Sequence, residues 1–256
     1  MSAKLIGEGD QPLVCTPVVA KTRNLILTEV NNILEKKPDI IEWRADFFDE
    51  INDTNEVLSL AGQIADKTGD TPTIFTLRSS SEGGNHIPGF SQEDAFKLIA
   101  AVSKHTDMEY VDYELSNPPE QIEKLREITA ANGTKIIASF HDFTLTPDKE
   151  TLFKKLVEAK QYSADVAKIA VMPNSLDDVL TLLGVTLDAK NTIDIPVITV
   201  SMGACGVATR LLGGMFGSAV TFAVGHESSA PGQIPIDELK TVLEVVHKSS
   251  GNYIRN

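Results

Sequence analysis

One lysine of this chain is embedded in a hydrophobic segment. Lys168 lies within residues 164–173, a largely apolar run of strand length and composition. Burying an ammonium group is costly, so a desolvated lysine is expected to have a lowered pKa and to lose its proton readily. The neutral amine is a nucleophile that forms a Schiff base with a ketone or an aldehyde. The structural alternative is a lysine that pairs with a carboxylate or reaches solvent from a strand end.

Further residues with useful chemistry stand within or just after strand-like segments. Alternation over 40–46 places Glu42, Arg44 and Asp46 on one face. Taken singly these residues have structural explanations, such as an ion-pair lattice at a rim. The other such residues are Arg78 and Glu82 after 73–77, Asp112 and Glu114 in 110–115, His141 after 135–140, Arg210 after 196–202, and Ser229 and Gln233 in the Gly-, Ser- and Pro-rich segment 225–235.

The elements that must position these residues alternate regularly along the chain. Helix-like stretches follow each strand-like segment, as in 91–105, where Ser91 and Asp94 form a capping-box pattern. Strands that alternate with helices indicate a parallel sheet. The eight strand-like segments are 13–19, 40–46, 73–77, 110–115, 135–140, 166–172, 196–202 and 219–224. We therefore predict an α/β fold, a single (β/α)8 TIM barrel over residues 1–256, with a doubly wound open sheet as the alternative. In such a barrel the catalytic residues lie at the carboxyl ends of the strands, where these side chains meet.

Composition limits the function further. The chain has 256 residues, of which 42% are hydrophobic and 23% charged, and a net charge of −13. So acidic a chain is not expected to bind nucleic acid or an anionic membrane through its general field, and an anionic substrate needs locally clustered arginines. Cys15 and Cys205 fit no metal or redox spacing, which favours free thiols in the cytoplasm. No apolar run is long enough to predict a membrane span.

The combined pattern resembles the type I 3-dehydroquinate dehydratases, the metal-free class that forms a Schiff base. The resemblance covers nearly the whole chain, and Thr209 stands where that family is expected to have serine. It rests on Glu42-Trp43-Arg44-Ala45-Asp46, Arg78 with Glu82-Gly83-Gly84, Ser139-Phe140-His141-Asp142-Phe143, Lys168 with Ala170-Val171-Met172-Pro173, Ser201-Met202-Gly203, Arg210, and Ser229-Ala230-Pro231-Gly232-Gln233-Ile234.

This resemblance implies a reaction and a set of roles. The reaction is the dehydration of 3-dehydroquinate to 3-dehydroshikimate in the shikimate pathway, which leads to the aromatic amino acids. Lys168 is implied as the Schiff-base nucleophile, His141 as the general base and acid, and Glu82 as its partner. The implied substrate-binding residues are Arg210 for the carboxylate, Glu42, Arg44 and Arg78 for the ring hydroxyls, Met202 and Phe222 as apolar walls, and Ser229 and Gln233 on a closing lid over 225–235. The resemblance implies no metal and no organic cofactor. It also implies that two copies of the chain form a homodimer.

Three alternatives remain open from the sequence. A class I aldolase shares the barrel and the lysine but cleaves a carbon–carbon bond. A non-catalytic barrel that binds sugar acids needs no lysine and histidine on adjacent strands. A metal-dependent lyase could use as ligands the carboxylates Glu42, Asp46, Asp112 and Glu114.

Overall fold

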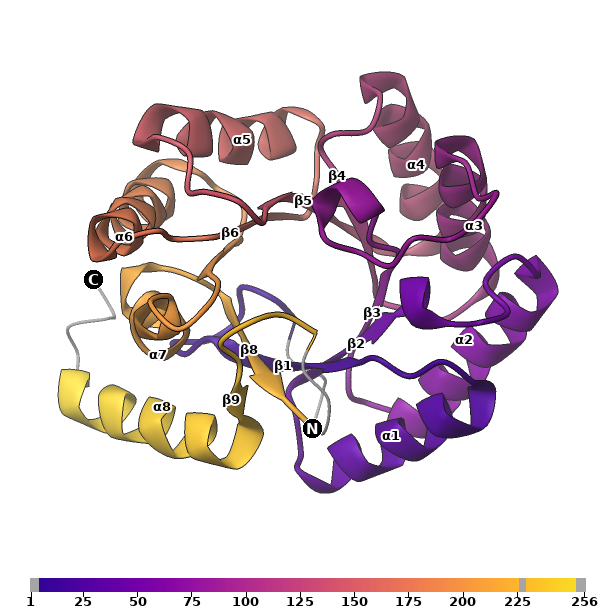
Figure 1. Cartoon of the computed structure of the whole chain (residues 1–256), viewed down its shortest axis with the longest axis horizontal. Coiled ribbons are helices and arrows are strands. Elements are labelled where there is room, and N and C mark those ends of the chain that lie inside the picture. Colours follow the sequence, from indigo (N-terminus) through magenta and orange to yellow (C-terminus); the bar gives the residue numbers. More distant parts are fainter. Residues whose placement is uncertain (1–4, 226–228, 252–256) are drawn as a thin grey trace.

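The strands of the protein form a ring around a common axis (Figure 1). The computed structural model describes residues 5–225 and 229–251. Within them, eight strands pair in parallel in the order of the sequence. These are β1 (Leu13–Val18), β2 (Ile40–Arg44), β3 (Thr73–Thr76), β4 (Tyr110–Glu114), β5 (Lys135–Asp142), β6 (Val166–Val171), β7 (Val197–Ser201) and β8 (Val220–Val224).

The ring closes through β8, which lies between the first and the seventh strands. On one side Leu13 of β1 lies opposite Val220. On the other side Ser218 forms a bridge with Val197 of β7, and the Ala219 amide donates to the Val197 carbonyl at 2.8 Å. The predicted (β/α)8 barrel is therefore confirmed, and the open doubly wound sheet is wrong.

Helices surround the ring and cover its outer face (Figure 1). The capping box predicted at Ser91 and Asp94 is confirmed at the start of α3. The helices are α1 (Arg23–Glu35), α2 (Thr54–Thr68), α3 (Gln92–His105), α4 (Pro119–Asn132), α5 (Lys149–Gln161), α6 (Leu176–Thr192), α7 (Val207–Phe216) and α8 (Ile236–Ser250). None of the helices among the described residues combines the length and the apolar composition needed to cross a bilayer.

Several boundaries differ from the sequence-based expectation. β2 ends at Arg44, and Asp46 lies in a short 3-10 helix, η1 (Ala45–Phe47). β5 extends to Asp142, so His141 is part of the strand and not of the following loop. A second 3-10 helix, η2 (Ser80–Glu82), follows β3, and a two-residue strand, β9 (Ile234–Pro235), pairs with β8. These short elements depend on contacts between loops, which have no periodic signal in the sequence.

Two apolar layers hold the barrel together. The larger lies between the strands and the helices, with Trp43 and Phe75 in edge-on contact at 5.4 Å between ring centroids. The smaller fills the barrel interior at the amino ends of the strands and includes Ile40, Ile74 and Tyr110. Because strand side chains alternate between the two faces, the same strands contribute to both layers. The interior layer also forms the floor beneath the polar residues described next.

Candidate active site

The barrel interior changes from apolar to polar along the strands. On β2, Ile40 is followed at steps of two residues by Glu42 and Arg44, and all three are buried. On β6, Lys168 lies between the interior residues Val166 and Ala170. Every parallel strand delivers its carboxyl end to the same mouth, so the alternation gathers the polar side chains there.

All eleven residues expected from the sequence line one cavity at this mouth. They come from six strands and the segments that follow them, including Glu82 in η2 and Arg210 in α7, and 191 positions separate Glu42 from Gln233 in the sequence. The lining includes Glu42, Arg44, Arg78, Glu82, His141, Lys168, Met202, Arg210, Phe222, Ser229 and Gln233, together with Phe143, Ala170, Val200 and Ala230. The structure thus brings the predicted residues together, while their chemical roles stay predictions.

The environment of Lys168 differs from the sequence-based expectation. Its Nζ donates to Asp112 Oδ2 at 2.9 Å and to Glu42 Oε1 at 3.3 Å, and it lies 4.9 Å from the centre of the Phe222 ring. Burial lowers the pKa of Lys168, but the carboxylates of Asp112 and Glu42 more than offset burial and raise it above its ordinary value. The expected lowering of this pKa is therefore wrong, and next to these two carboxylates the lysine is an ammonium ion.

His141 is held by a carboxylate on its far side. Its Nδ1 lies 2.9 Å from Glu82 Oε2, and its backbone amide donates to the same oxygen at 3.1 Å. Burial, with the nearby charges of Arg78 and Lys168, holds the pKa of His141 well below its ordinary value, so the ring is neutral. The network assigns the ring proton to Nδ1, which leaves Nε2 with a lone pair as a base requires.

The acid side of the pH dependence of activity is expected to reflect the protonation of Glu82. Burial and the adjacent Glu114 raise the pKa of Glu82 to about 7. Below that pH the carboxyl gains a proton and supports a positive charge on His141 less well. We expect kcat/KM to fall about tenfold per pH unit below pH ~7. A pH–rate profile of Glu82→Gln should lack this limb at a lower overall rate, and an unchanged limb would assign it to another group.

Arg210 is a buried cation with no carboxylate partner among the described residues. Its guanidinium donates to the backbone carbonyls of Phe222, at 3.4 Å, and Pro231, at 3.0 Å, and its Nε has no hydrogen-bond partner within residues 5–225 and 229–251. The side chain is 2% exposed, and burial lowers its pKa to about 10. A buried charge in this state favours an anionic ligand, because a carboxylate supplies both the missing charge and the missing acceptors.

The other two arginines are already neutralised within the protein. Arg44 makes two hydrogen bonds of 2.8 Å to the Asp46 carboxylate. Arg78 contacts Asp112 at 2.8 Å and Glu114 at 3.0 Å, which raise its pKa despite burial. Neither arginine thus provides an unpaired charge to a ligand, although both line the cavity. Of the carboxylates suggested as metal ligands, Asp46, Asp112 and Glu114 are engaged in these pairs and Glu42 accepts from Lys168 and Thr76. The described residues contain no group of three His, Cys, Asp or Glu arranged for a metal ion.

The described part of the segment after β8 lines the cavity with Ser229, Ala230 and Gln233. Residues 226–228 of this segment lie outside the described residues, so the expected lid over 225–235 is seen only in part. Ser229 and Gln233 bond to each other across the turn, with two contacts of 3.1 Å. The segment rests on the loop after β7, where the Gly203 amide donates to the Pro231 carbonyl at 3.1 Å. That carbonyl is also the acceptor for Arg210, so the position of the lid and that of the arginine are coupled.

Gly232 is required for this close approach. Its φ is +78°, and a Cβ built there would lie 2.2 Å from the Gly203 carbonyl oxygen. We expect Gly232→Ala to displace the lid, release the Pro231 carbonyl from Arg210 and raise KM. Gly133→Ala is the matched control, because Gly133 has a φ of +79° but no atom within 4 Å of a built Cβ. Equal KM values for the two variants, measured in steady state, would contradict the coupling.

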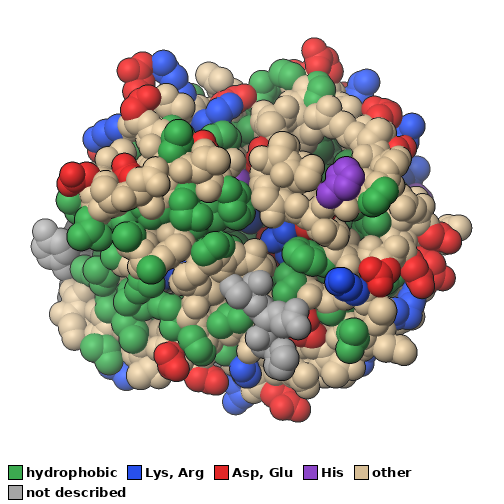
Figure 2. Space-filling view, in the orientation of Figure 1, with side chains coloured by type: hydrophobic (Ala, Val, Ile, Leu, Met, Phe, Trp, Pro, Cys, Tyr) green, Lys and Arg blue, Asp and Glu red, His purple; other side chains and the backbone are tan. Residues whose placement is uncertain are grey.

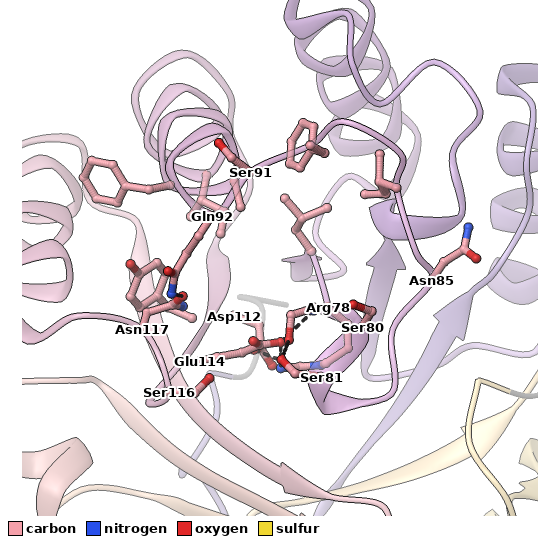
Figure 3. Close-up of a pocket in the computed structure, with 18 of the residues that line it drawn as sticks. Arg78, Ser80, Ser81, Asn85, Ser91, Gln92, Asp112, Glu114, Ser116 and Asn117 are labelled. Carbon is pink, nitrogen blue, oxygen red and sulfur yellow. Dashed lines mark hydrogen bonds and ion pairs between the residues drawn. The ribbon is translucent and has the colours of Figure 1, made fainter.

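A larger cavity of about 400 Å³ lies behind the site, between α3 and the segments that follow β3 and β4 (Figure 3). Its wall includes Ser116 and Asn117 but neither Lys168 nor His141. Figure 3 shows Arg78, Asp112 and Glu114 together at its base. Ser116 donates to Glu82 Oε1 at 2.7 Å, which links this cavity to the carboxylate behind His141.

Sequence reasoning did not assign three residues that hold the site in place. Thr76 donates to Glu42 at 2.9 Å, Ser139 donates to Asp112 at 2.6 Å, and Ser116 fixes Glu82. The signal was available in part, since Thr76 and Ser139 occupy interior positions on their strands, two residues from Arg78 and His141.

Comparison with known proteins agrees with this geometry. The sequence pattern of the family described as type I 3-dehydroquinase matches residues 14–250. A 3-dehydroquinate dehydratase of Aromatoleum aromaticum is 45% identical over 249 residues, which cover 97% of this chain and 95% of that protein. The crystal structure of the 3-dehydroquinate dehydratase from Geobacillus kaustophilus has a TM-score of 0.92 and 44% identity, covering 95% of this chain and 94% of the other.

A second solved structure is that of a type I 3-dehydroquinate dehydratase from Clostridium difficile with covalently modified comenic acid. It has a TM-score of 0.91 and 37% identity, and covers 97% of this chain and all of that chain. The family pattern and both structures extend over the strands that build the cavity. The chain therefore belongs to the type I 3-dehydroquinase family.

Proposed function

We propose that this chain dehydrates 3-dehydroquinate to 3-dehydroshikimate, through a Schiff base on Lys168, as a step of the shikimate pathway towards the aromatic amino acids. Membership of the type I family supports the reaction. The observation that carries the proposal is the joint presence in one cavity of a buried lysine, a neutral histidine and an arginine without an anionic partner among the described residues. These are the groups needed for a substrate with a ketone, an acidic carbon and a carboxylate.

The proposed reaction begins when the Lys168 ammonium passes a proton to His141. The amine then attacks the ring ketone, and one N–H proton moves to the former ketone oxygen. His141 gives the proton it had accepted to the same oxygen, which leaves as water, so His141 is neutral again and the product is an iminium ion that acidifies the adjacent carbon. His141 removes a proton from that carbon and returns it to the leaving hydroxyl, while Glu82 steadies the charge that His141 gains. Hydrolysis of the resulting iminium releases the product. The lysine supplies the electron sink, so the proposal includes no metal and no organic cofactor.

The remaining residues position the substrate. Arg210 holds the carboxylate, and Met202 and Phe222 pack against the ring. Glu42, Arg44 and Arg78 lie where ring hydroxyls are expected, but their existing partners limit them to shared hydrogen bonds. Ser229 and Gln233 close the site from the lid, which excludes water while the imine exists.

Two measurements test the proposed function. Incubation with 3-dehydroquinate should produce the absorbance of a conjugated enone, and borohydride should add the mass of the reduced ligand to the peptide that contains Lys168. Carbon–carbon cleavage products in place of the enone would favour the aldolase alternative. Tight binding without turnover or adduct would favour the non-catalytic barrel.

We further propose a single catalytic domain over 1–256 that forms a homodimer. Exposed hydrophobic side chains gather over α6, α7 and α8 (Figure 2), including Leu180 at 65% and Val245 at 59% exposure. Two chains of net charge −13 repel each other, so an uncharged face is where two copies meet at the lowest cost. Light scattering, which gives the mass in solution, tests the dimer.

The free thiols Cys15 and Cys205 support a cytoplasmic location for the protein.

A further inference from the structure

The two carboxylate oxygens of Asp112 have different partners. Oδ1 accepts from Ser139 Oγ at 2.6 Å and from Arg78 Nη2 at 2.8 Å. Oδ2 accepts from Lys168 Nζ at 2.9 Å. Asp112 is 2% exposed and lies on β4, with one strand between it and the lysine. One oxygen is thus anchored to the barrel wall, and the other faces the nucleophile.

This anchoring fixes the negative charge in space. Arg78 is itself held by Glu114, and Ser139 lies opposite Lys168 in the pairing of β5 with β6. Burial disfavours a charged carboxylate, but Arg78 and Lys168 hold the pKa of Asp112 well below its usual range. Asp112 therefore stays ionised and cannot follow the lysine nitrogen when the substrate arrives.

The charge on the Lys168 nitrogen is the same before and after Schiff-base formation. An ammonium ion and a ketone give an iminium ion and one water: a carbon–nitrogen bond forms, the carbon–oxygen bond breaks, and two N–H protons leave with the oxygen. The nitrogen carries one positive charge both before and after the reaction. A single carboxylate at this position therefore stabilises the resting lysine and the electron sink equally.

We infer that Asp112 is the fixed counter-ion that keeps the nitrogen of Lys168 positively charged both as the free ammonium group and as the Schiff base. The inference rests on the proposed Schiff-base function and adds a positioning residue to it. Without this carboxylate the imine loses its proton more readily, and a neutral imine withdraws electrons too weakly to acidify the adjacent carbon.

The other charged and titratable groups around Lys168 are less suited to this role. Glu42 is farther away, at 3.3 Å, and the same oxygen also accepts from Thr76. Burial and Glu42 raise the pKa of Cys15, so that thiol is neutral. The groups that face the lysine from the neighbouring strands and the segments after them are Cys15 on β1, Glu42 on β2, Arg78 after β3, Asp112 on β4 and His141 on β5.

The test is the pH dependence of Asp112→Asn, which keeps the side-chain shape but removes the charge. An opposite charge in contact shifts a pKa by about 1–3 units, so the alkaline limb of kcat should move down by about that much. The ratio of variant to wild-type kcat should fall about 10-fold to 1000-fold between about pH 6 and pH 9. Trapping with cyanoborohydride, which reduces only the protonated imine, should show the same limb.

Glu114→Gln is the matched control. Glu114 lies on the same strand and also pairs with Arg78 but makes no contact with Lys168, so its alkaline limb should stay at the wild-type pH. An activity ratio for Asp112→Asn that is constant with pH would overturn the inference. Wild-type protein without dehydratase activity would instead contradict the proposed function.

If the Asp112→Asn variant does not fold, a measurement on the wild-type protein tests the same inference. The rate at which an amine-specific acylating reagent modifies Lys168, followed by mass spectrometry against pH, gives the pKa of the lysine directly. The counter-ion predicts a half-maximal rate above the ordinary value of about pH 10.4. A half-maximal rate below about pH 8 would show that burial prevails over Asp112, and the inference would fail.

Discussion

Lys168→Ala is expected to abolish turnover and the borohydride-trapped adduct together, whereas His141→Ala should keep the adduct and lose turnover by about 10²–10⁴-fold. The lysine is the described amine that lines the cavity, so no covalent intermediate forms without it. The histidine acts on protons, and water replaces it slowly during imine formation. Elimination, which needs a base beside the acidic carbon, should then become rate-limiting.

Rapid-quench trapping and steady-state rates measured on the same samples separate the two roles. Accumulation of a substrate-mass adduct on Lys168 in the His141→Ala protein is the expected signature. Turnover of His141→Ala within about tenfold of wild type would exclude His141 as the base, because that loss is below the usual contribution of general base catalysis. An adduct on a different lysine would contradict the assignment of Lys168.

Arg210→Lys is expected to raise KM by about 10-fold to 100-fold. A hydrogen bond to a charged group contributes about 1.5–3 kcal/mol, and each 1.4 kcal/mol is about a factor of ten in binding. Lysine keeps the charge but is a point donor, so it cannot bind a carboxylate with two parallel hydrogen bonds. With the carbonyls of Phe222 and Pro231 both engaged, a lysine has only one of its three donors left for the ligand, whereas arginine has five.

Arg126→Lys provides the control for this substitution. Arg126 pairs with Asp165 at 2.6 Å, near the amino end of β6 and outside the cavity, so its replacement should leave KM unchanged. Competition by simple carboxylates adds a second measurement, since their inhibition should weaken in Arg210→Lys as KM rises. If KM and kcat of Arg210→Lys both equal the wild-type values, the substrate carboxylate binds elsewhere.

The sequence was sufficient to predict the barrel and the location of the site. Alternation with a period of two placed Glu42 and Arg44 on one face, and the rule that parallel strands present their carboxyl ends together brought Lys168 and His141 to one mouth. Both inferences depend on local patterns and on a general property of barrels, and neither needs a specific contact. The carboxyl end of β5 depends on such contacts and was predicted too early, and the 3-10 helices, which also depend on them, were not predicted.

The electrostatics of the site could not be predicted in the same way. The pKa of Lys168 was expected to fall because its own segment is apolar, but its partners Glu42 and Asp112 lie 126 and 56 positions away in the sequence. The sequence identified these carboxylates as candidate site residues but did not show which lysine or arginine each one pairs with. Likewise, the family resemblance assigned the carboxylate to Arg210, but the physical reason is visible only in the structure, where Arg44 and Arg78 are paired with carboxylates and Arg210 has no such partner among the described residues.

The crowded layer of charges above the apolar floor has a consequence for laboratory evolution of this protein. Replacing buried ion pairs with well-packed apolar residues of similar volume is often neutral or stabilising, by about 1–4 kcal/mol. The interior positions around Arg78 and Asp112 are fully enclosed, which is where such replacements act most strongly. Selection for heat resistance alone will therefore tend to erode the catalytic centre first, and a screen for robust variants needs an activity readout in every round.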